Sequence, residues 1–164
     1  LLKVDTNTIQ SDRYQSAKML HEKYQGPVVL KGCGSIIADS RGDLFVCASG
    51  NPGMSSGGMG DVLTGVIAGL LAQGIEMDEE IFEAATNRQP ILKRKIDIIG
   101  DATKFGVLLH SHAADMAAGE GVNSLQRGLM ATDLMPCLRQ LANSSPWDEY
   151  QTKVWEKENC EDRT

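Results

Sequence analysis

The sequence predicts an α/β fold on the strength of two local patterns. Residues 27–30, Pro-Val-Val-Leu, form a short apolar run without polar alternation, which is typical of a strand buried on both faces of an α/β sheet. Farther along, a glycine-rich loop at 49–60 runs directly into an apolar helix pattern that opens at Asp61. The composition suits one domain with a core, since 41% of the 164 residues are hydrophobic and 23% are charged.

The first part of the chain predicts a helix before this strand and a hairpin after it. Ser11 is the expected N-cap of the helix, which ends at Gly26 because the following proline blocks continuation. Its apolar side chains recur at near-helical spacing: Tyr14, Ala17, Leu20 and Tyr24. Two short apolar runs, 36–38 and 44–47, flank the turn formers Asp-Ser-Arg-Gly-Asp and predict the two strands of the hairpin.

The glycine-rich loop and the helix after it form the next predicted unit. The loop at 49–60 contains five glycines, and a loop of this length is uncommon unless it is functional. The helix that Asp61 opens carries a wide apolar stripe: Val62, Leu63, Val66, Ile67, Leu70 and Leu71. Gly65 and Gly69 would permit close packing of this helix against a neighbour. We therefore expect the helix to be buried.

The remainder of the chain is predicted to be helical with a polar end. Separate helices are expected at 79–85, 106–118 and 129–141, the last two joined by a glycine-bearing turn. Residues 86–105 contain a proline and a basic cluster and show no clean period, so no element is assigned to them. From Asn143 onward the chain is polar and charged.

Charge and composition argue against several classes of protein. The net charge of −6 is unsuited to holding nucleic-acid phosphates or an anionic membrane surface, and Lys-Arg-Lys at 93–95 is interpreted as a solvated loop. The most apolar stretch, 62–75, is interrupted and is shorter than the roughly 20 residues of a membrane span. The first residues carry no secretory pattern. Four widely spaced cysteines indicate reduced thiols and a cytoplasmic protein: Cys33, Cys47, Cys137 and Cys160.

The glycine-rich loop is the strongest candidate for chemistry. A helix N-terminus presents unpaired N–H groups and a positive partial charge, which favours a phosphate. Gly57, Gly58 and Gly60 would let the backbone approach phosphoryl oxygens, and Asp61 adds a carboxylate that could act as a general base. Asp61 could equally be the N-cap of the helix, and the loop could simply be flexible. The loop is neither a Walker A motif nor G-x-G-x-x-G.

Two other groups of residues are weaker candidates. Lys-Gly-Cys-Gly-Ser at 31–35 follows the predicted strand, where open α/β sheets bind ligands, but it could also be a plain turn with a solvated lysine. His110, His112 and Asp115 would diverge on a helix and make a poor metal triad, so packing or surface roles are expected. His21 is expected to be a solvated side chain on the first helix.

Four motifs, in this order, carry a resemblance to a known family: VVLKGCGSII, GNPGMSSGGMGDVLTGVIAGLLAQG, HSHAADMAA and GLMATDLMP. Residues 10–141 resemble the C-terminal domain of ADP- or ATP-dependent NAD(P)H-hydrate dehydratases, the ribokinase-like YjeF C-terminal family. The resemblance implies a three-layer α/β/α sandwich whose N-terminal half has no counterpart before Leu1. Residues 1–142 would form this partial domain, with an atypical insertion near 86–105, and 143–164 a polar tail.

The same resemblance implies a reaction and a set of site residues. NADH or NADPH hydrated at C6 of the nicotinamide ring would be phosphorylated on the new hydroxyl and would then lose phosphate. Asp61 would contact the hydrate and act as base. The anion hole would be Gly57, Gly58, Met59 and Gly60. The adenine nucleotide would be held by Lys31, Gly32, Cys33, Gly34, Ser35, Asn51 and Gly60.

Cofactor and partners follow from this assignment. Mg²⁺ is expected to bridge the phosphates of ADP or ATP, with no protein ligand assigned. The NPGM form of the glycine-rich motif is similar to the bacterial, ADP-using branch of the family. The partners would be hydrated NADH or NADPH and the nucleotide, with a homo-oligomer as a possible assembly. Ser35 replaces a threonine and Ser111 a glycine of the family pattern. The alternatives are a ribokinase-like kinase for a small alcohol and an inactive nucleotide-binding fragment.

Overall fold

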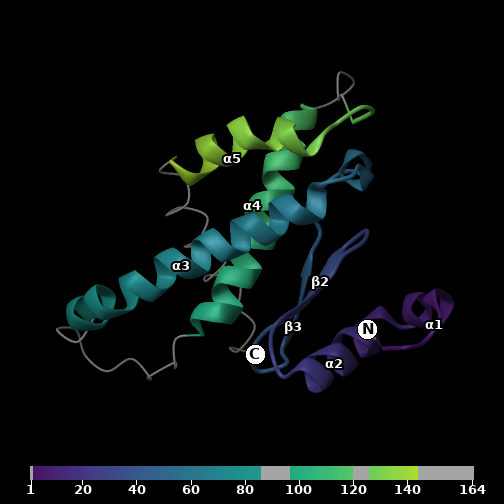
Figure 1. The fold of residues 1–164 in the computed structure, drawn as a ribbon, viewed down its shortest axis with the longest axis horizontal. Coiled ribbons are helices and arrows are strands. Elements are labelled where there is room, and N and C mark those ends of the chain that lie inside the picture. The colour runs from purple at the N-terminus through teal and green to yellow at the C-terminus, as the bar shows by residue number, and fades with distance from the viewer. Residues whose placement is uncertain (1, 86–96, 120–125, 144–164) are drawn as a thin grey trace, which may run out of the picture.

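A computed structural model of the chain describes residues 2–85, 97–119 and 126–143 (Figure 1). Five α-helices, three strands and two short 3₁₀ helices lie in these ranges. In chain order they are α1 (Thr6–Ser11), α2 (Arg13–Tyr24), β1 (Val28–Leu30), β2 (Ser35–Ala38), β3 (Leu44–Cys47), η1 (Pro52–Ser55), α3 (Met59–Ala85), α4 (Ile98–Ala118), η3 (Ala131–Asp133) and α5 (Leu134–Ala142). The basic cluster at 93–95, Cys160 and nearly all of the polar tail lie outside the described residues.

The predicted first helix is α2, but its N-cap is Asp12, so the assignment of Ser11 is wrong. The Asp12 carboxylate accepts a hydrogen bond from the backbone N–H of Gln15 at 2.9 Å. Ser11 instead ends the short preceding helix α1, and its hydroxyl donates to the Thr8 carbonyl. Both residues are favoured caps, and the turn between the helices selects the one whose side chain reaches a free N–H group.

The three strands form an antiparallel sheet in the order β1-β2-β3. The predicted hairpin is confirmed, with Ser35 opposite Cys47 and Ala38 opposite Leu44. The buried Asp39 carboxylate stabilises its turn by accepting from the backbone N–H groups of Arg41 and Asp43. The expectation that the first strand is buried on both faces is wrong, since all of β1 is only half-buried and β1 pairs with β2 alone among the described strands.

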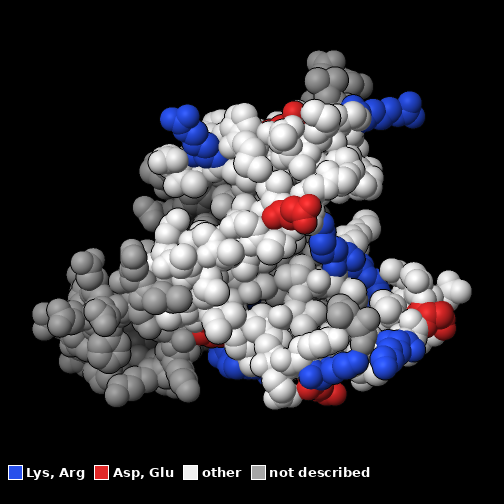
Figure 2. All heavy atoms as spheres, in the orientation of Figure 1, with Lys and Arg blue, Asp and Glu red and all other residues white. Residues whose placement is uncertain are grey.

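Helices cover both faces of this sheet (Figure 1). Along β2, Ile37 packs with Leu63 of α3 and Val107 of α4, whereas Ile36 and Ala38 point to the opposite face, where α2 lies against β1 and β2. Figure 2 shows that charged side chains gather over α2, while the surface over the first part of α3, residues 59–73, is mostly uncharged. The described residues are therefore a mixed α/β arrangement with the sheet between two helical layers.

Helix α3 is a single helix that reaches Ala85, so the separate helix expected at 79–85 is wrong. Its apolar stripe is also less covered than expected, because Leu63 is buried but Val66 and Leu70 are half-buried. At Gly65 and Gly69, the place where a Cβ atom would lie has no neighbouring atoms within 4 Å, so neither glycine makes a close helix contact. Both lie on the exposed face of α3.

Gly106 of α4 supplies the close approach between α3 and α4. A Cβ atom on Gly106 would lie 2.6 Å from Cγ1 of Ile67, so no larger residue fits without displacing α3. Helix α4 begins at Ile98, and Asp97 caps it by accepting from the N–H of Gly100 at 2.9 Å. Part of the unassigned stretch 86–105 is thus helical, and 86–96 lies outside the described residues.

The C-terminal end of the described chain packs on α4. The helix predicted at 129–141 is found as η3 followed by α5, with Leu134 fully buried at the junction. A core cluster joins it to α3 and α4: Met59, Ala113, Ala114, Leu129 and Leu134. The described cysteines Cys33, Cys47 and Cys137 are free thiols. Over the ranges that the structure covers, none of the helices combines the length and the apolar character needed to cross a bilayer.

Candidate functional site

The glycine-rich loop delivers the chain to the N-terminus of α3. Gly58 has φ +84°, a left-handed conformation that favours glycine, and the helix begins at the next residue, Met59. The N–H of Val62 donates to the Gly58 carbonyl at 3.1 Å, the first intrahelical bond. The N–H groups before Val62 therefore have no partner within the helix. Gly57 and Gly58 are exposed, so this end of α3 is accessible to an anion.

Asp61 lies in the first turn of α3 and is exposed. The interpretation of Asp61 as the N-cap is wrong, because Gly58 holds that position and Asp61 is the third helical residue. Its carboxylate makes no hydrogen bond or ion pair with any described residue. A carboxylate in the first turn does stabilise a helix, because it lies near the positive end of the helix dipole. Asp61 is thus placed beside the anion-accepting N–H groups with its oxygens available to a substrate.

Lys31 meets the same helix end from a different loop. A Cβ atom on Gly60 would lie 3.7 Å from Nζ of Lys31, so the ammonium group lies beside the first turn of α3. Lys31 is exposed and forms no ion pair with a described acid. The fold therefore brings together two of the segments predicted from sequence, 31–35 and 49–60. Their combined charge, a full positive charge and a helix N-terminus, favours a polyanion.

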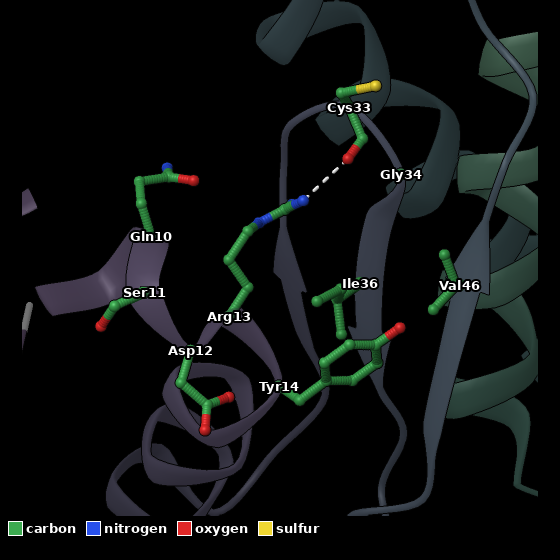
Figure 3. A pocket seen from close by; sticks show the side chains of 9 residues that line it. All are labelled: Gln10, Ser11, Asp12, Arg13, Tyr14, Cys33, Gly34, Ile36 and Val46. Atoms are coloured by element: carbon green, nitrogen blue, oxygen red, sulfur yellow. Dashed lines mark hydrogen bonds between the residues drawn. The ribbon is translucent and has the colours of Figure 1, made fainter. Parts of the chain in front are cut away.

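The 31–35 loop is held from the other side by Arg13, which was not among the residues predicted from sequence (Figure 3). Nη1 of Arg13 donates to the Cys33 carbonyl at 2.8 Å and Nη2 to the Leu30 carbonyl at 3.1 Å. Gly32 has φ +153°, and a Cβ atom there would lie 2.8 Å from Nη2. Only a residue without a side chain lets the guanidinium approach this closely, and no spacing rule in the sequence links Arg13 to the loop.

An open hollow of about 330 Å³ lies beside Arg13 and does not reach Asp61 (Figure 3). It is lined by Gln10, Ser11, Asp12, Arg13, Tyr14, Cys33, Gly34, Ile36 and Val46. Cys33 and Gly34 are the predicted site residues that border it. No residue of the glycine-rich loop takes part, so this hollow and the N-terminus of α3 are different surfaces of the described chain.

The other predicted site residues occupy varied positions. The Asn51 amide is engaged with α4 and with its own loop, so its side chain already has partners. The hydroxyl of Ser35 donates to the Gly32 carbonyl at 3.4 Å, within the 31–35 turn. Met59 is only 1% exposed and packs in the core, which leaves its backbone as the part that could face an anion.

His110 of α4 is buried behind the same helix end. It is 2% exposed, and its Nε2 atom has no hydrogen-bond partner among the described residues. Burial and the nearby positive charge of Lys31 lower the pKa of His110, while the backbone of Met59 acts in the opposite direction. The sequence predicted packing or surface roles for His110 and His112. Within the described ranges, His, Cys, Asp and Glu do not form a group of three that could hold a metal ion.

The lowered pKa of His110 predicts a loss of stability in acid. The unfolded chain takes up a proton at His110 near the ordinary value of 6.5, at a pH where the folded protein keeps it neutral. The contribution of neutral His110 is therefore complete above 6.5 and decreases as the pH falls toward the folded-state pKa. Urea unfolding measured from about pH 8 to about pH 5 should show a steeper decrease for the natural chain than for His110→Gln. Equal pH slopes in the two proteins would contradict this prediction.

Fold and site together define a class of protein. Helices cover both faces of a sheet, and a glycine-rich loop entering a helix lies beside a lysine, an arrangement typical of α/β proteins that bind nucleotide phosphates. Residues 1–125 match the family described as NAD(P)H-hydrate dehydratase, and the chain belongs to this family. The resemblance inferred from the sequence motifs is thereby confirmed.

Two curated relatives illustrate the relationship. The chain is 44% identical over 143 residues to the bifunctional NAD(P)H-hydrate repair enzyme Nnr of Coxiella burnetii, covering 87% of this chain and 24% of that enzyme. It is 32% identical over 143 residues to the ADP-dependent (S)-NAD(P)H-hydrate dehydratase of Neisseria meningitidis serogroup B, covering 87% and 40%. The chain spans about a quarter of the length of the bifunctional relatives that it matches.

The fold matches part of a solved structure of the same kind. The ADP/ATP-dependent NAD(P)H-hydrate dehydratase from Bacillus subtilis, co-crystallized with ATP/Mg²⁺ and soaked with CoA, is 25% identical with a TM-score of 0.60. The match covers 84% of this chain and 42% of that chain. The described residues are therefore a mixed α/β fragment of a dehydratase fold.

Proposed function

We propose that this chain contributes to the ADP- or ATP-dependent dehydration of NADH or NADPH hydrated at C6 of the nicotinamide ring. The observation that carries the proposal is the position of the Lys31 ammonium beside Gly60 at the start of α3, where Asp61 offers an available carboxylate. Lysine and helix N–H groups suit phosphates, and a carboxylate suits proton transfer. Family membership supports the hydrated dinucleotide as the molecule that carries the hydroxyl.

The proposed mechanism has two steps in which this site takes part. Asp61 accepts the proton of the C6 hydroxyl while the hydroxyl oxygen attacks the terminal phosphorus of the nucleotide, which leaves one phosphate shorter. The N–H groups of Gly57–Gly60 and the ammonium of Lys31 stabilise the negative charge on the transferring phosphoryl oxygens. The C6–O bond then breaks, phosphate departs, and a proton leaves the neighbouring ring carbon as the double bond is restored.

The nucleotide would lie across the two loops that meet at α3. The 31–35 loop and the 49–60 loop offer backbone N–H groups and the Lys31 ammonium, which lies beside Gly60. Mg²⁺ is usually held by substrate phosphates together with one or two carboxylates, and none of the described carboxylates is assigned to it, since Asp61 is the proposed base. When bound, Mg²⁺ would neutralise charge on the phosphates. The related Bacillus subtilis enzyme was co-crystallized with ATP/Mg²⁺, which supports this choice of ligand.

We further propose that the described elements form one part of a ribokinase-like three-layer α/β/α sandwich. Helices on both faces of the β1-β2-β3 sheet support this arrangement, as does the match to less than half of the Bacillus subtilis chain. In the complete sandwich further strands would extend the sheet, and further residues would contact the hydrate.

A direct assay tests the proposed function. The chain is incubated with hydrated NADH, Mg²⁺ and either ADP or ATP, and we expect restored NADH and free phosphate in equal amounts. A matched mixture without nucleotide should restore none above the uncatalysed rate. Accumulation of a phosphorylated alcohol from a different substrate would contradict the proposal and favour a small-alcohol kinase. Nucleotide binding without restored NADH would contradict catalysis by this stretch and favour a non-catalytic binding fragment.

A further inference from the structure

The glycine-rich loop is tied at its beginning to α4 by one carboxylate, that of Asp115. Oδ2 of Asp115 accepts a hydrogen bond from the backbone N–H of Gly50 at 2.9 Å. Oδ1 accepts another from Nδ2 of Asn51 at 3.0 Å. Asp115 lies 64 residues from Asn51 in the sequence, so the tether exists only in the folded chain. Both oxygens are used as acceptors toward adjacent residues of the same loop.

Asn51 passes this restraint into the loop. Its Nδ2 atom also donates to the Ala114 carbonyl at 3.0 Å, and its Oδ1 atom accepts from the N–H of Gly53 at 3.0 Å. The Asn51 carbonyl accepts from Met54, which opens the 3₁₀ helix η1. Gly53 lies against the Gln126 carbonyl and against Cβ of Leu129. The first half of the loop is therefore held between α4 and the residues that precede η3.

In the second half of the loop Gly58 lies near Ala131, since a Cβ atom on Gly58 would be 3.2 Å from Cβ of Ala131, but among the described residues no hydrogen bond ties Gly57 or Gly58 to α4. A Cβ atom on Gly57 would have no neighbouring atoms within 4 Å, and Gly57 and Gly58 are both exposed. The position of Gly57 and Gly58 relative to Lys31 is fixed at one end by η1, which ends at Ser55, and at the other by the buried side chain of Met59. Holding backbone that would otherwise be free lowers the entropic cost of ordering the loop when a ligand binds.

We propose that Asp115 is a positioning residue for the nucleotide, acting through Gly50 and Asn51 on the loop that carries the anion-binding N–H groups. This inference rests on the proposed function for its effect on catalysis, but the tether itself can be tested separately. The tether needs a side chain with two hydrogen-bond acceptors, as the two carboxylate oxygens of Asp115 provide. In Asp115→Asn one oxygen becomes an NH₂ group, which must oppose the N–H of Gly50 or the NH₂ of Asn51, so one of the two bonds is lost.

Hydrogen exchange of the backbone amides in the 164-residue chain tests the tether. In Asp115→Asn we expect the amide affected by the lost bond, Gly50 directly or Gly53 through Asn51, to exchange at least about tenfold faster than in the natural chain. Asp101→Asn is the matched control, because Asp101 is an exposed acid of the same helix that contacts Lys104 and not the loop. Asn51→Ala should accelerate exchange of the Gly53 amide and leave the Gly50 amide protected, since the bond from Gly50 to Asp115 remains. If Asp115→Asn does not fold, this variant tests the tether in its place.

Steady-state kinetics test the consequence for the nucleotide. With hydrated NADH saturating, Asp115→Asn should raise KM for ADP or ATP by about tenfold while kcat changes much less, and Asp101→Asn should leave both unchanged. Exchange rates at Gly50 and Gly53 equal to those of the control would overturn the inference. Faster exchange with an unaltered KM would also overturn it, since the tether would then be purely structural. Complete absence of turnover in the natural chain would refute the proposed function, while the exchange rates would still decide the tether.

Discussion

Asp61→Asn is expected to reduce restoration of NADH by about 10²–10⁴-fold while nucleotide binding remains largely intact. Asn keeps the size and the polarity of the side chain but cannot accept the proton of the C6 hydroxyl. Because the Asp61 carboxylate has no described partner, its replacement leaves no buried group unsatisfied. The loss of a first-turn charge should cost the fold only about 0.3–1 kcal/mol.

The matched control for this prediction is Asp101→Asn. Asp101 lies in the first turn of α4 as Asp61 lies in the first turn of α3, so both variants remove the same helix-end interaction. Turnover of hydrated NADH and binding of ADP are measured in parallel for the two proteins. Equal turnover in Asp61→Asn and Asp101→Asn would show that Asp61 only stabilises its helix, and the proposed base would have to be another group.

Met59→Ala is expected to lower the free energy of unfolding by about 2–5 kcal/mol, the largest stability effect that we predict. Met59 is 1% exposed and is the first residue of α3, where its side chain packs against Leu129 and Leu134. Truncation removes those contacts and leaves a cavity under the end of the glycine-rich loop. The free energy is obtained from urea unfolding followed by circular dichroism.

Met135→Ala makes the same chemical change at an exposed position of α5. Met135 is 48% exposed, so its truncation should change the free energy of unfolding by no more than about 0.5 kcal/mol. A loss in Met59→Ala no greater than that in Met135→Ala would mean that Met59 does not anchor the loop. The comparison also separates the side chain of Met59, which belongs to the core, from its backbone, which belongs to the proposed anion hole.

Elements signalled by local chemistry were predictable from the sequence. The turn formers between Ala38 and Leu44 lie within five residues of one another and predicted the hairpin that the structure contains. The glycine-rich loop and the helix after it were predicted for the same reason. The N-terminus of α3 was displaced by two residues, because Gly58 adopts the left-handed conformation and lets the helix begin at Met59 rather than at Asp61.

Predictions that required knowledge of neighbours were less accurate. The apolar run of β1 suggested burial on both faces, yet β1 has one described strand beside it and is half-buried. Gly65 and Gly69 suggested close helix packing, but Gly106 on the partner helix makes that contact. A pattern within one element indicates which residues are able to pack, and the partner element determines which of them do.

Residue types at short spacing were enough to predict the family, the glycine-rich loop, the helix that follows it and the candidate residues Lys31 and Asp61. These patterns depend only on residues close together in the sequence, so they can be interpreted without knowing how the rest of the chain folds. Three features became visible only in the folded chain: the position of Lys31 beside Gly60, the hydrogen bonds of Arg13 to the 31–35 loop, and the bond from Gly50 to Asp115. All three involve residues far apart in the sequence. They form because burying the apolar faces of α2, α3 and α4 against the sheet brings polar groups at the ends of these elements within hydrogen-bonding distance.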